Sequence, residues 1–512
     1  MKFVEKIISY FENEGIPFIH YFVGFIFIVL FRNFIELYAT RQDNYLIQVL
    51  FYTPFYFALA AWFILLFRFF IKERIEKIAR IVLVSFVLII IPPVLDSIIT
   101  WGGPVRMKYI GVSDFKSIVE KYFTILFSFK NNQQSIGQRV EIIITTILSF
   151  FYFYYKIKSI WKSILCALSV YTSIYIFGIF TFLVNSLIQC FNIESVLDIL
   201  FLAKFYFLIS VIFLIPIFYF YNKKYFKALM KDLRYERLIH FFLMFFLGFI
   251  LFFNFKKDPD STIAFINSEI IYYFILIPIS IVFAALFTIM INNIQDVEGD
   301  RISNINRPLV SEKIPLVSYK RIAWLALVIS LLASLLVNRT CFILISLVIG
   351  SYYVYSCPPL RIKKIPILSK FIVGINSFLM ALMGYAVFGG PVLTFPSEYA
   401  FFILVPLSLA SNFIDLKDYG GDKAMGILTL PVIFGLSISK IIISVFTLFS
   451  YVTIYLIIKD YHLPVYIELA PFLLCLLHIY FLNRKNYKER PVFAIYLSGL
   501  IALLIILINQ IR

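Results

Sequence analysis

The sequence has 512 residues, of which 62% are hydrophobic, 19% aromatic and only 15% charged. Soluble domains are about 45–50% apolar, so this composition excludes a water-soluble protein and any large domain outside the membrane. The formal net charge is +17. In so apolar a chain, the basic residues favour short loops that face anionic lipid and phosphate groups, rather than nucleic acid. We therefore expect an integral membrane protein that lies in the lipid bilayer and binds no nucleic acid.

The apolar runs form two blocks on either side of a polar linker, residues 222–237. A helix needs about 20 apolar residues to cross the hydrocarbon core, and backbone in lipid must bond within its own segment. The first block has six such runs, at residues 17–38, 46–70, 81–100, 141–155, 163–187 and 197–221. The second has nine, at residues 238–255, 270–291, 322–337, 341–355, 367–388, 399–413, 441–458, 463–482 and 492–507. The pattern predicts an all-α polytopic fold with domains at 1–222 and 223–512.

The basic residues of the loops indicate the orientation of these spans. Lys and Arg accumulate in short cytoplasmic loops. If the N-terminus is cytoplasmic, every second loop lies on the cytoplasmic side. Each of these loops carries a basic cluster, as at residues 72–80, 156–162 and 483–490. We therefore expect a multi-pass protein of the cell membrane whose N-terminus lies in the cytoplasm. Two acidic loops of the second block fall on the same side by this count.

These two loops carry oxygen-bearing side chains at matching spacing. Each loop has two aspartates four residues apart, which share one face of a helix. A third residue with a side-chain oxygen, an asparagine or an aspartate, precedes each pair. The residues are Asn292, Asp296 and Asp300 in the first loop and Asp415, Asp418 and Asp422 in the second. Stacked carboxylates repel, and Mg²⁺ prefers hard oxygen ligands shared with substrate phosphates. Two sets that face each other would hold metal ions over one diphosphate.

Basic residues and glycines near these carboxylates agree with such a site. Several Lys and Arg side chains could bind phosphoryl oxygens directly. They are Arg301, Arg307, Lys313, Arg361, Lys363, Lys364, Lys417 and Lys423. The glycines at 299, 420, 421 and 426 permit close approach of the backbone. The two loops are therefore expected to meet at one phosphate-binding site.

The motifs in these loops resemble those of the UbiA superfamily of intramembrane prenyltransferases. The matching residues are Asn292, Asp296 and Asp300 with Asn306-Arg307-Pro308-Leu309, Tyr355-Ser356 with Pro358-Pro359-Leu360-Arg361, and Asp415, Asp418, Gly421, Asp422, Gly426 and Thr429-Leu430-Pro431. The resemblance covers roughly residue 238 to the C-terminus. It implies a nine-helix transmembrane bundle, in agreement with the nine runs of the second block, preceded here by about six further transmembrane helices.

By this resemblance, the protein transfers a polyprenyl group from an allylic diphosphate donor to a lipophilic, membrane-associated acceptor, with Mg²⁺ as cofactor. The acceptor would be an aromatic or quinone precursor or a lipid headgroup. The catalytic residues implied are Asp296, Asp300, Asp418, Asp422 and Tyr355. The metal ligands implied are Asn292, Asn293, Asp296, Asp300, Asp415, Asp418 and Asp422. The diphosphate contacts implied are Arg307, Arg361, Lys363, Lys417 and Lys423.

Two positions depart from the family pattern. Asn293 stands where the first motif usually has an aspartate, and Glu312 stands where a glycine commonly follows a serine. The first change removes one negative charge from the expected metal site.

Other functions stay open at this point. Within the same superfamily these are phosphoribosyl-type transfer and terpene cyclisation, and outside it a cation-binding transporter. A transporter would place its carboxylates near the middle of the bilayer, whereas these lie at the ends of predicted spans. In the first block, Arg32 and Glu36 lie four residues apart, and Asp96 and Arg106 lie around the end of the third run. Charges within a membrane are costly and often functional, but Arg32 and Glu36 are expected to pair with each other.

Overall fold

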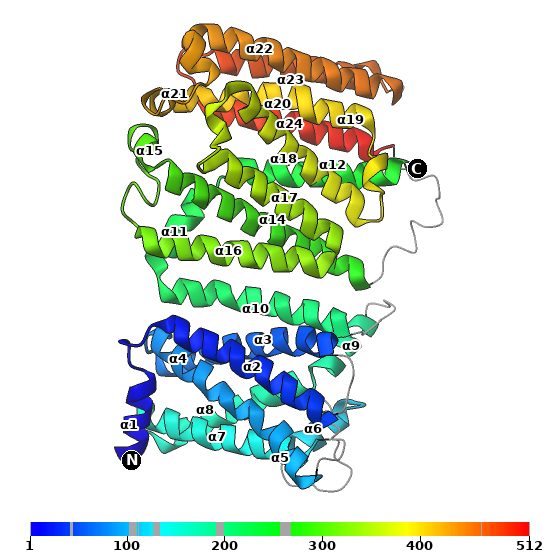
Figure 1. Ribbon diagram of the computed structural model, residues 1–512. Coiled ribbons are helices and arrows are strands. Elements are labelled where there is room, and N and C mark those ends of the chain that lie inside the picture. Colours follow the sequence, from blue (N-terminus) through cyan, green and yellow to red (C-terminus); the bar gives the residue numbers. More distant parts are fainter. Residues whose placement is uncertain are drawn as a thin grey trace. The chain divides into compact units, whose positions relative to one another are not determined.

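The computed structural model describes residues 2–40, 45–101, 110, 112–125, 134–190, 199–255, 268–461 and 463–510. Throughout this part of the chain the regular structure is helical, without strands. The chain divides into two compact units (Figure 1). Unit 1 comprises Met1–Lys223 with Ile266–Ile270, and unit 2 comprises Lys224–Phe265 with Ile271–Arg512.

Unit 1 is a bundle of apolar helices. Its α-helices are α1 (Lys2–Phe11), α2 (Phe18–Thr40), α3 (Tyr45–Ile71), α4 (Ile75–Ser85), α5 (Ile91–Ile99), α6 (Phe115–Thr124), α7 (Ile136–Ile157), α8 (Ile160–Gly178), α9 (Phe180–Cys190) and α10 (Ile199–Tyr221). The 3₁₀ turn Phe86–Ile90 joins α4 to α5, so that the three segments make one span. In this unit α10 packs along α3 and α7 packs along α8.

Unit 2 contains the second block of spans, although Lys223 and residues 268–270, at the starts of two of its helices, are grouped with unit 1. Its α-helices are α11 (Lys223–Asp232), α12 (Tyr235–Phe255), α14 (Ser268–Gln295), α15 (Val297–Ser303), α16 (Leu316–Val337), α17 (Arg339–Ser356), α18 (Pro366–Val387), α19 (Ser397–Phe402), α20 (Ser408–Ala410), α21 (Asp415–Ala424), α22 (Leu430–Ile458), α23 (Val465–Asn483) and α24 (Glu489–Ile508). The π-helical segment Ile403–Leu407 and the 3₁₀ turn Ser411–Ile414 connect α19, α20 and α21.

The number of spans agrees with the sequence. Among the described residues, fifteen helices are long and apolar enough to cross a membrane, six up to Tyr221 and nine after it. The all-α polytopic fold is therefore confirmed. The fourth span is longer than predicted, because α7 begins at Ile136. Ser135 and Gln138 form a reciprocal capping box there, which satisfies backbone N–H groups at the start of the helix. Polar residues lie in this first turn, so the apolar pattern of the sequence does not include it in the span.

Glycines allow α12 and α18 to pack closely in unit 2. A Cβ atom at Gly248 would lie 1.7 Å from the carbonyl oxygen of Ala381, and one at Gly384 would lie 1.8 Å from that of Phe245. In lipid, the hydrophobic effect does not bring helices together. Small residues at a helix crossing let the two backbones approach closely, so that van der Waals packing can stabilise the contact. Nearby, the ring of His240 bonds the Ser377 hydroxyl at 2.8 Å. This contact fixes α12, which begins beside the acidic loops.

In unit 1, Arg32 and Glu36 are both buried and form the expected ion pair. The Arg32 guanidinium also lies over the rings of Tyr52 and Tyr56, at 4.6 and 5.3 Å from their centroids. Asp96 is buried as well and accepts the Gly137 N–H at 2.8 Å. Arg106 lies outside the described residues.

Candidate active site

The first acidic motif spans the junction of two helices. Helix α14 ends at Gln295, with Asn292 in its last turn, and α15 begins at Val297. Asp296 stands between them, and its carbonyl oxygen accepts the backbone N–H of Asp300 at 2.8 Å. The chain therefore keeps a helical turn from Asp296 to Asp300, as the spacing in the sequence predicts, although the helix axis changes at Asp296.

The second motif lies on α21, and glycines bring it against α15. A Cβ at Gly421 would lie 2.9 Å from the Gly299 carbonyl oxygen and 2.5 Å from the Ser303 hydroxyl, and one at Gly299 would lie 2.2 Å from the Met425 sulfur. A side chain at Gly421 would meet the Gly299 backbone and push the helices apart, whereas one at Gly299 would displace the Met425 side chain. At the neighbouring Gly420, a Cβ would make only an ordinary contact of 3.8 Å. Helices α15 and α21 thus meet at one end of unit 2 (Figure 1).

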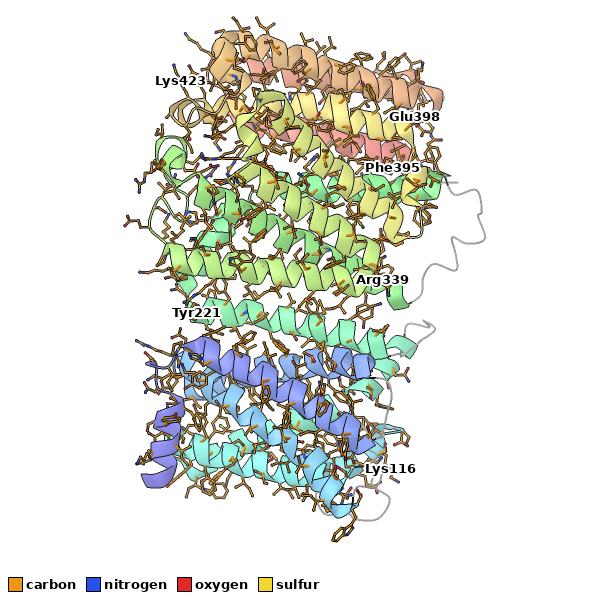
Figure 2. The ribbon with its side chains drawn as sticks, viewed as in Figure 1. Lys116, Tyr221, Arg339, Phe395, Glu398 and Lys423 are labelled. Atoms are coloured by element: carbon orange, nitrogen blue, oxygen red, sulfur yellow. The ribbon has the colours of Figure 1, made fainter. Side chains whose placement is uncertain are left out.

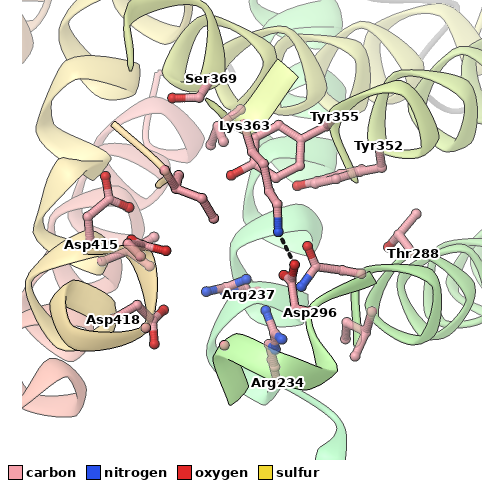
Figure 3. Close-up of a pocket in the computed structure, with 18 of the residues that line it drawn as sticks. Arg234, Arg237, Thr288, Asp296, Tyr352, Tyr355, Lys363, Ser369, Asp415 and Asp418 are labelled. Atoms are coloured by element: carbon pink, nitrogen blue, oxygen red, sulfur yellow. Dashed lines mark hydrogen bonds and ion pairs between the residues drawn. The ribbon is translucent and has the colours of Figure 1, made fainter. Parts of the chain in front are cut away.

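Both motifs line one cavity of about 170 Å³. The lining includes all six predicted oxygen-bearing residues, Asn292, Asp296, Asp300, Asp415, Asp418 and Asp422. Figure 3 shows Asp415 and Asp418 on one side and Asp296 on the other, with Arg234 and Arg237 between them. The Asn304 amide nitrogen donates to Asp300 Oδ1 at 3.2 Å and to Asp418 Oδ1 at 3.1 Å, so one side chain bridges the motifs.

Positive and negative side chains balance around this cavity. Among the described residues that line it, five are acidic and five are basic. The basic residues are Arg234, Arg237, Arg307, Lys363 and Lys370. Arg307 pairs with Asp300, Lys363 pairs with Asp296, and Lys370 pairs with Asp415 at 2.7 Å. The aspartates are thus neutralised by cations that come from other parts of the chain.

Burial and neighbouring charges shift the pKa values of these groups. Burial raises the pKa of Asp300 to about 6, although the Arg307 guanidinium opposes this shift. Burial also lowers the pKa of Lys363, with Asp296 opposing. The pKa of Arg234 falls to about 9, because it is buried and lies near Arg237 and Arg307. At neutral pH these shifts leave Asp300 mostly ionised and Arg234 positively charged.

The donor set fits a hard divalent cation. Within the part of the chain that the structure describes, no three His, Cys, Asp or Glu side chains are grouped closely enough to hold a metal ion as they stand. Three of the aspartates instead hold lysine or arginine side chains. Asp415 Oδ2 is nevertheless buried and has no hydrogen-bond partner. A buried carboxylate oxygen with a free lone pair at a cavity wall is an available ligand for Mg²⁺.

The basic candidates Arg301, Lys313 and Lys364 do not line the cavity, and neither do four of the residues to which the family resemblance gives a role. Arg361 is not part of the lining, but its guanidinium lies 3.2 Å from Asp296 Oδ1 and donates to the Gln295 carbonyl oxygen. Lys417 pairs with Glu489 at 3.1 Å. Lys423 lies at the outer side of α21 (Figure 2), with its ammonium group 5.7 Å from the Tyr419 ring centroid.

The fourth, Asn293, is 1% exposed and uses both amide atoms in hydrogen bonds. Its nitrogen donates to Asp232 Oδ2 at 2.6 Å and to the Tyr319 hydroxyl at 2.9 Å. Its oxygen accepts from Arg234 at 3.1 Å and from Arg307 at 2.9 Å. The side chain therefore connects α11 to two arginines of the cavity.

Sequence reasoning missed three of the five basic residues that line the cavity, Arg234, Arg237 and Lys370. Arg234 and Arg237 belong to the polar stretch that was interpreted as a linker between domains, and Lys370 lies inside a predicted span. A lysine buried in an apolar run is itself a signal, because such charges are costly in a membrane and are usually paired. Tyr355, which was predicted, does line the cavity, and Tyr352 lies beside it with ring centroids 6.3 Å apart.

Comparisons with known proteins agree with this arrangement. Residues 242–500 match the model of the UbiA prenyltransferase family. The 2-acyl-4-prenylphloroglucinol 6-prenyltransferase of Humulus lupulus is 35% identical over 179 residues, which are 32% of this chain and 42% of the hop enzyme. The digeranylgeranylglyceryl phosphate synthase of Sulfurisphaera tokodaii is 26% identical over 234 residues, 44% of this chain and 78% of that enzyme.

A solved structure is also similar. The UbiA homologue from Archaeoglobus fulgidus, bound to DMAPP and Mg²⁺, has 20% sequence identity and a TM-score of 0.41, over 55% of this chain and 99% of its own. The family match covers just over half of the 512 residues and includes both aspartate motifs. This chain therefore belongs to the UbiA prenyltransferase family.

Proposed function

We propose that this protein transfers a polyprenyl group from an allylic diphosphate to a membrane-associated acceptor, in a Mg²⁺-dependent reaction. The observation that carries the proposal is the cavity with five acidic and five basic side chains. In a cavity that bound only cations, the five arginine and lysine side chains would repel the ligand and compete with it for the carboxylates. A magnesium diphosphate carries both signs, so each set of side chains has a partner in it.

The acidic residues have the role of metal ligands in this proposal. Asp296, Asp300, Asp415, Asp418 and Asp422 would hold Mg²⁺, with Asn292 as a further oxygen donor. Bound Mg²⁺ would supply Lewis-acid stabilisation of the diphosphate leaving group. Asn293 takes a different role from that of the sequence prediction, because its amide atoms already bond Asp232, Tyr319 and two arginines. We assign it to positioning Arg234 and Arg307.

The basic residues act on the diphosphate. Arg234, Arg237, Arg307, Lys363 and Lys370 line the cavity and donate hydrogen bonds to phosphoryl oxygens once the aspartates release them. The bond between the allylic carbon and oxygen breaks, and its electron pair leaves with the diphosphate. Fixed cations stabilise the charge that grows there, which lowers the barrier.

Aromatic and apolar residues of the cavity contact the prenyl group of the donor. Leu238, Phe241 and Ile289 line the cavity beside Tyr352 and Tyr355, and provide an apolar surface for the start of the prenyl chain. The face of an aromatic ring attracts a cation, so the two tyrosines are suited to the allylic carbocation. The acceptor then attacks this carbon and loses a proton.

The names of two relatives indicate two classes of acceptor for this reaction. One relative is named for the prenylation of a phloroglucinol, and another makes digeranylgeranylglyceryl phosphate. We propose an acceptor of one of these two chemistries, an electron-rich ring or the hydroxyl of a glycerol-phosphate lipid.

The test is release of diphosphate by the purified protein from allylic diphosphates of 10, 15 and 20 carbons, with and without Mg²⁺. We expect release only with the metal, and about a 10³-fold loss in Asp296→Ala, because that side chain acts on charge in the transition state. Glu298→Ala is the matched control, since Glu298 is acidic, exposed and two residues away. Equal turnover in Asp296→Ala and the wild type would exclude the mechanism. A product that is cyclised, or that carries a phosphorylated sugar, would indicate the other reactions of the superfamily.

A further inference from the structure

A second, larger cavity adjoins the proposed active site. Its volume is about 1070 Å³, and it lies in unit 2. It shares Arg234, Arg237, Ser303, Arg307 and Asp418 with the lining of the smaller cavity. We call this larger space the vestibule. A ligand in the vestibule would lie directly beside the groups that are proposed to bind the diphosphate.

The vestibule differs from the smaller cavity in its charge. Among the described residues that line it, nine are basic and five are acidic, a surplus of four positive charges. Some of these cations are paired, such as Lys417 with Glu489 at 3.1 Å and Arg490 with Glu236 at 3.5 Å. Lys224, Lys227, Lys231 and Lys313 are exposed and form no ion pair with any described residue. Their positive charge is available to a ligand.

Three of these lysines share one face of α11. Lys224, Lys227 and Lys231 are spaced by three and four residues and all line the vestibule. Like charges at this spacing destabilise a helix by a few tenths of a kcal/mol per pair. Ala228 and Leu229, on another face, are buried against the protein. Helix α11 therefore holds its lysines toward the vestibule at a cost that a bound anion would offset.

Helix α11 is also fixed to the active site. Asp232, its last residue, accepts from the Asn293 amide at 2.6 Å and from the Tyr319 hydroxyl at 3.0 Å. Asn293 in turn holds Arg234 and Arg307, which line both cavities. The helix precedes the segment that matches the family, residues 242–500. The lysine face therefore lies outside the matched segment and is connected to the active site by hydrogen bonds.

We propose that the vestibule binds the phosphate group of a lipid acceptor, with Lys224, Lys227 and Lys231 as its main contacts. This inference rests on the proposed prenyl transfer, and it selects the phosphate-bearing class of acceptor over the neutral aromatic class. The lysines hold the acceptor headgroup in the vestibule, and the shared arginines separate it from the diphosphate of the donor.

The test is direct binding to the full-length protein in neutral detergent. The probes are dihexanoyl phosphatidic acid and the matched dihexanoylglycerol, which lacks the phosphate. We expect the phosphatidic acid to bind the wild type about tenfold more tightly than the neutral lipid, with an affinity that falls as salt rises. The triple variant Lys224→Gln, Lys227→Gln, Lys231→Gln should lose this preference. The matched control is Lys320→Gln, Lys485→Gln, Lys488→Gln, which removes the same charge from exposed lysines outside both cavities and should keep it.

Three outcomes would overturn the proposal. The first is equal affinity of the triple variant and the wild type for phosphatidic acid, and the second is equal loss in the triple variant and the control. The third is displacement of the lipid by inorganic phosphate at the concentration at which the lipid itself binds, because the vestibule would then be a site for free phosphate. Binding measured in the Asp296→Ala variant separates this proposal from the reaction. That variant should bind the probe normally even if the assay for diphosphate release fails in every protein tested.

Discussion

The two units bury charge in different ways. In unit 1, Arg32 and Glu36 lie one turn apart on α2 and are only 4% and 2% exposed. Their interaction is local, and two tyrosine rings cover the guanidinium. In unit 2, Lys363 reaches Asp296 and Lys370 reaches Asp415 from elements far along the chain, and all four side chains line a cavity. A local pair that is covered on all sides stabilises a fold, whereas long-range pairs around a cavity can exchange partners with a ligand.

The largest effect should follow from Asp418→Ala. Asp418 lines the cavity, so its loss should lower kcat/KM for diphosphate release by about 10³-fold while the protein stays folded. Glu398→Ala is the control, because Glu398 is exposed and lies at the other end of unit 2 (Figure 2). Activity should be measured together with thermal inactivation in detergent. A loss of both in Asp418→Ala would mean that the unit 2 charges are structural, like those of unit 1.

Breaking the unit 1 pair should have the opposite signature. Glu36→Ala leaves Arg32 buried without its partner, which costs about 3–5 kcal/mol of stability. The activity of the protein that remains folded should change less than about twofold. The double variant Arg32→Met, Glu36→Leu removes both charges and should recover most of the stability. If the double variant is stable but inactive, the pair takes part in catalysis and the contrast between the units is wrong.

The approach of the two motifs is tested by Gly421→Ala. The added methyl group meets Ser303 and the Gly299 backbone, so α15 and α21 must separate. A shift of about 1 Å in the relative position of catalytic groups can lower the rate by up to about 10²-fold. Gly420→Ala adds the same methyl one residue away, where it makes only an ordinary contact. Equal rates in these two variants would contradict the importance of the crossing.

Removal of unit 1 gives a smaller expected effect. The cavity and the vestibule are lined by residues of unit 2. We therefore propose that a protein beginning at Lys223 folds and releases diphosphate within about threefold of the full-length rate, since the groups that act on charge are all retained. Gel filtration in detergent would show whether it folds. A folded but inactive product would place part of the catalytic machinery in residues 1–222, and Asp96 would be the next residue to replace.

The smallest expected change is a gain in stability from Glu312→Gly. Glu312 has φ 51°, in the left-handed region that side chains with a Cβ disfavour. Relief of this strain, less the extra backbone entropy of glycine, should stabilise the protein by about 0.5–1 kcal/mol. A rise in the midpoint of thermal inactivation would show it, with Glu298→Gly as the control on a helix. An unchanged or lower midpoint would mean that a contact of the Glu312 side chain outweighs the strain.

The sequence was sufficient for the parts of the site that depend on local spacing. Asp296 with Asp300, and Asp418 with Asp422, share helical faces, and both pairs line one cavity as expected. The strain at Glu312 is local as well, because it comes from the positive φ of that one residue. In each case the relevant geometry lies within a few residues of the chain.

The partners of these aspartates could not be predicted, because they depend on packing between distant elements. Lys370 belongs to a predicted span, and its contact with Asp415 crosses 45 residues of sequence. Arg234 and Arg237 lie in a polar stretch whose pattern predicts a linker. Asn293 was assigned to the metal by its position in the motif, whereas its hydrogen bonds lead to Asp232, 61 residues earlier. Spacing alone contains no information on contacts of this range.

The equal numbers of acidic and basic side chains around the smaller cavity affect how solutes find it. A surplus of one sign attracts counter-ions over the Debye length, about 10 Å at 0.1 M salt. In a balanced arrangement the fields of the two sets largely cancel outside the cavity. The smaller cavity therefore adds little long-range attraction of its own, and anions are attracted from a distance by the lysines of the vestibule beside it. Both charge sets of the smaller cavity act strongly on a ligand in contact with them, so its selection between ligands takes place at contact.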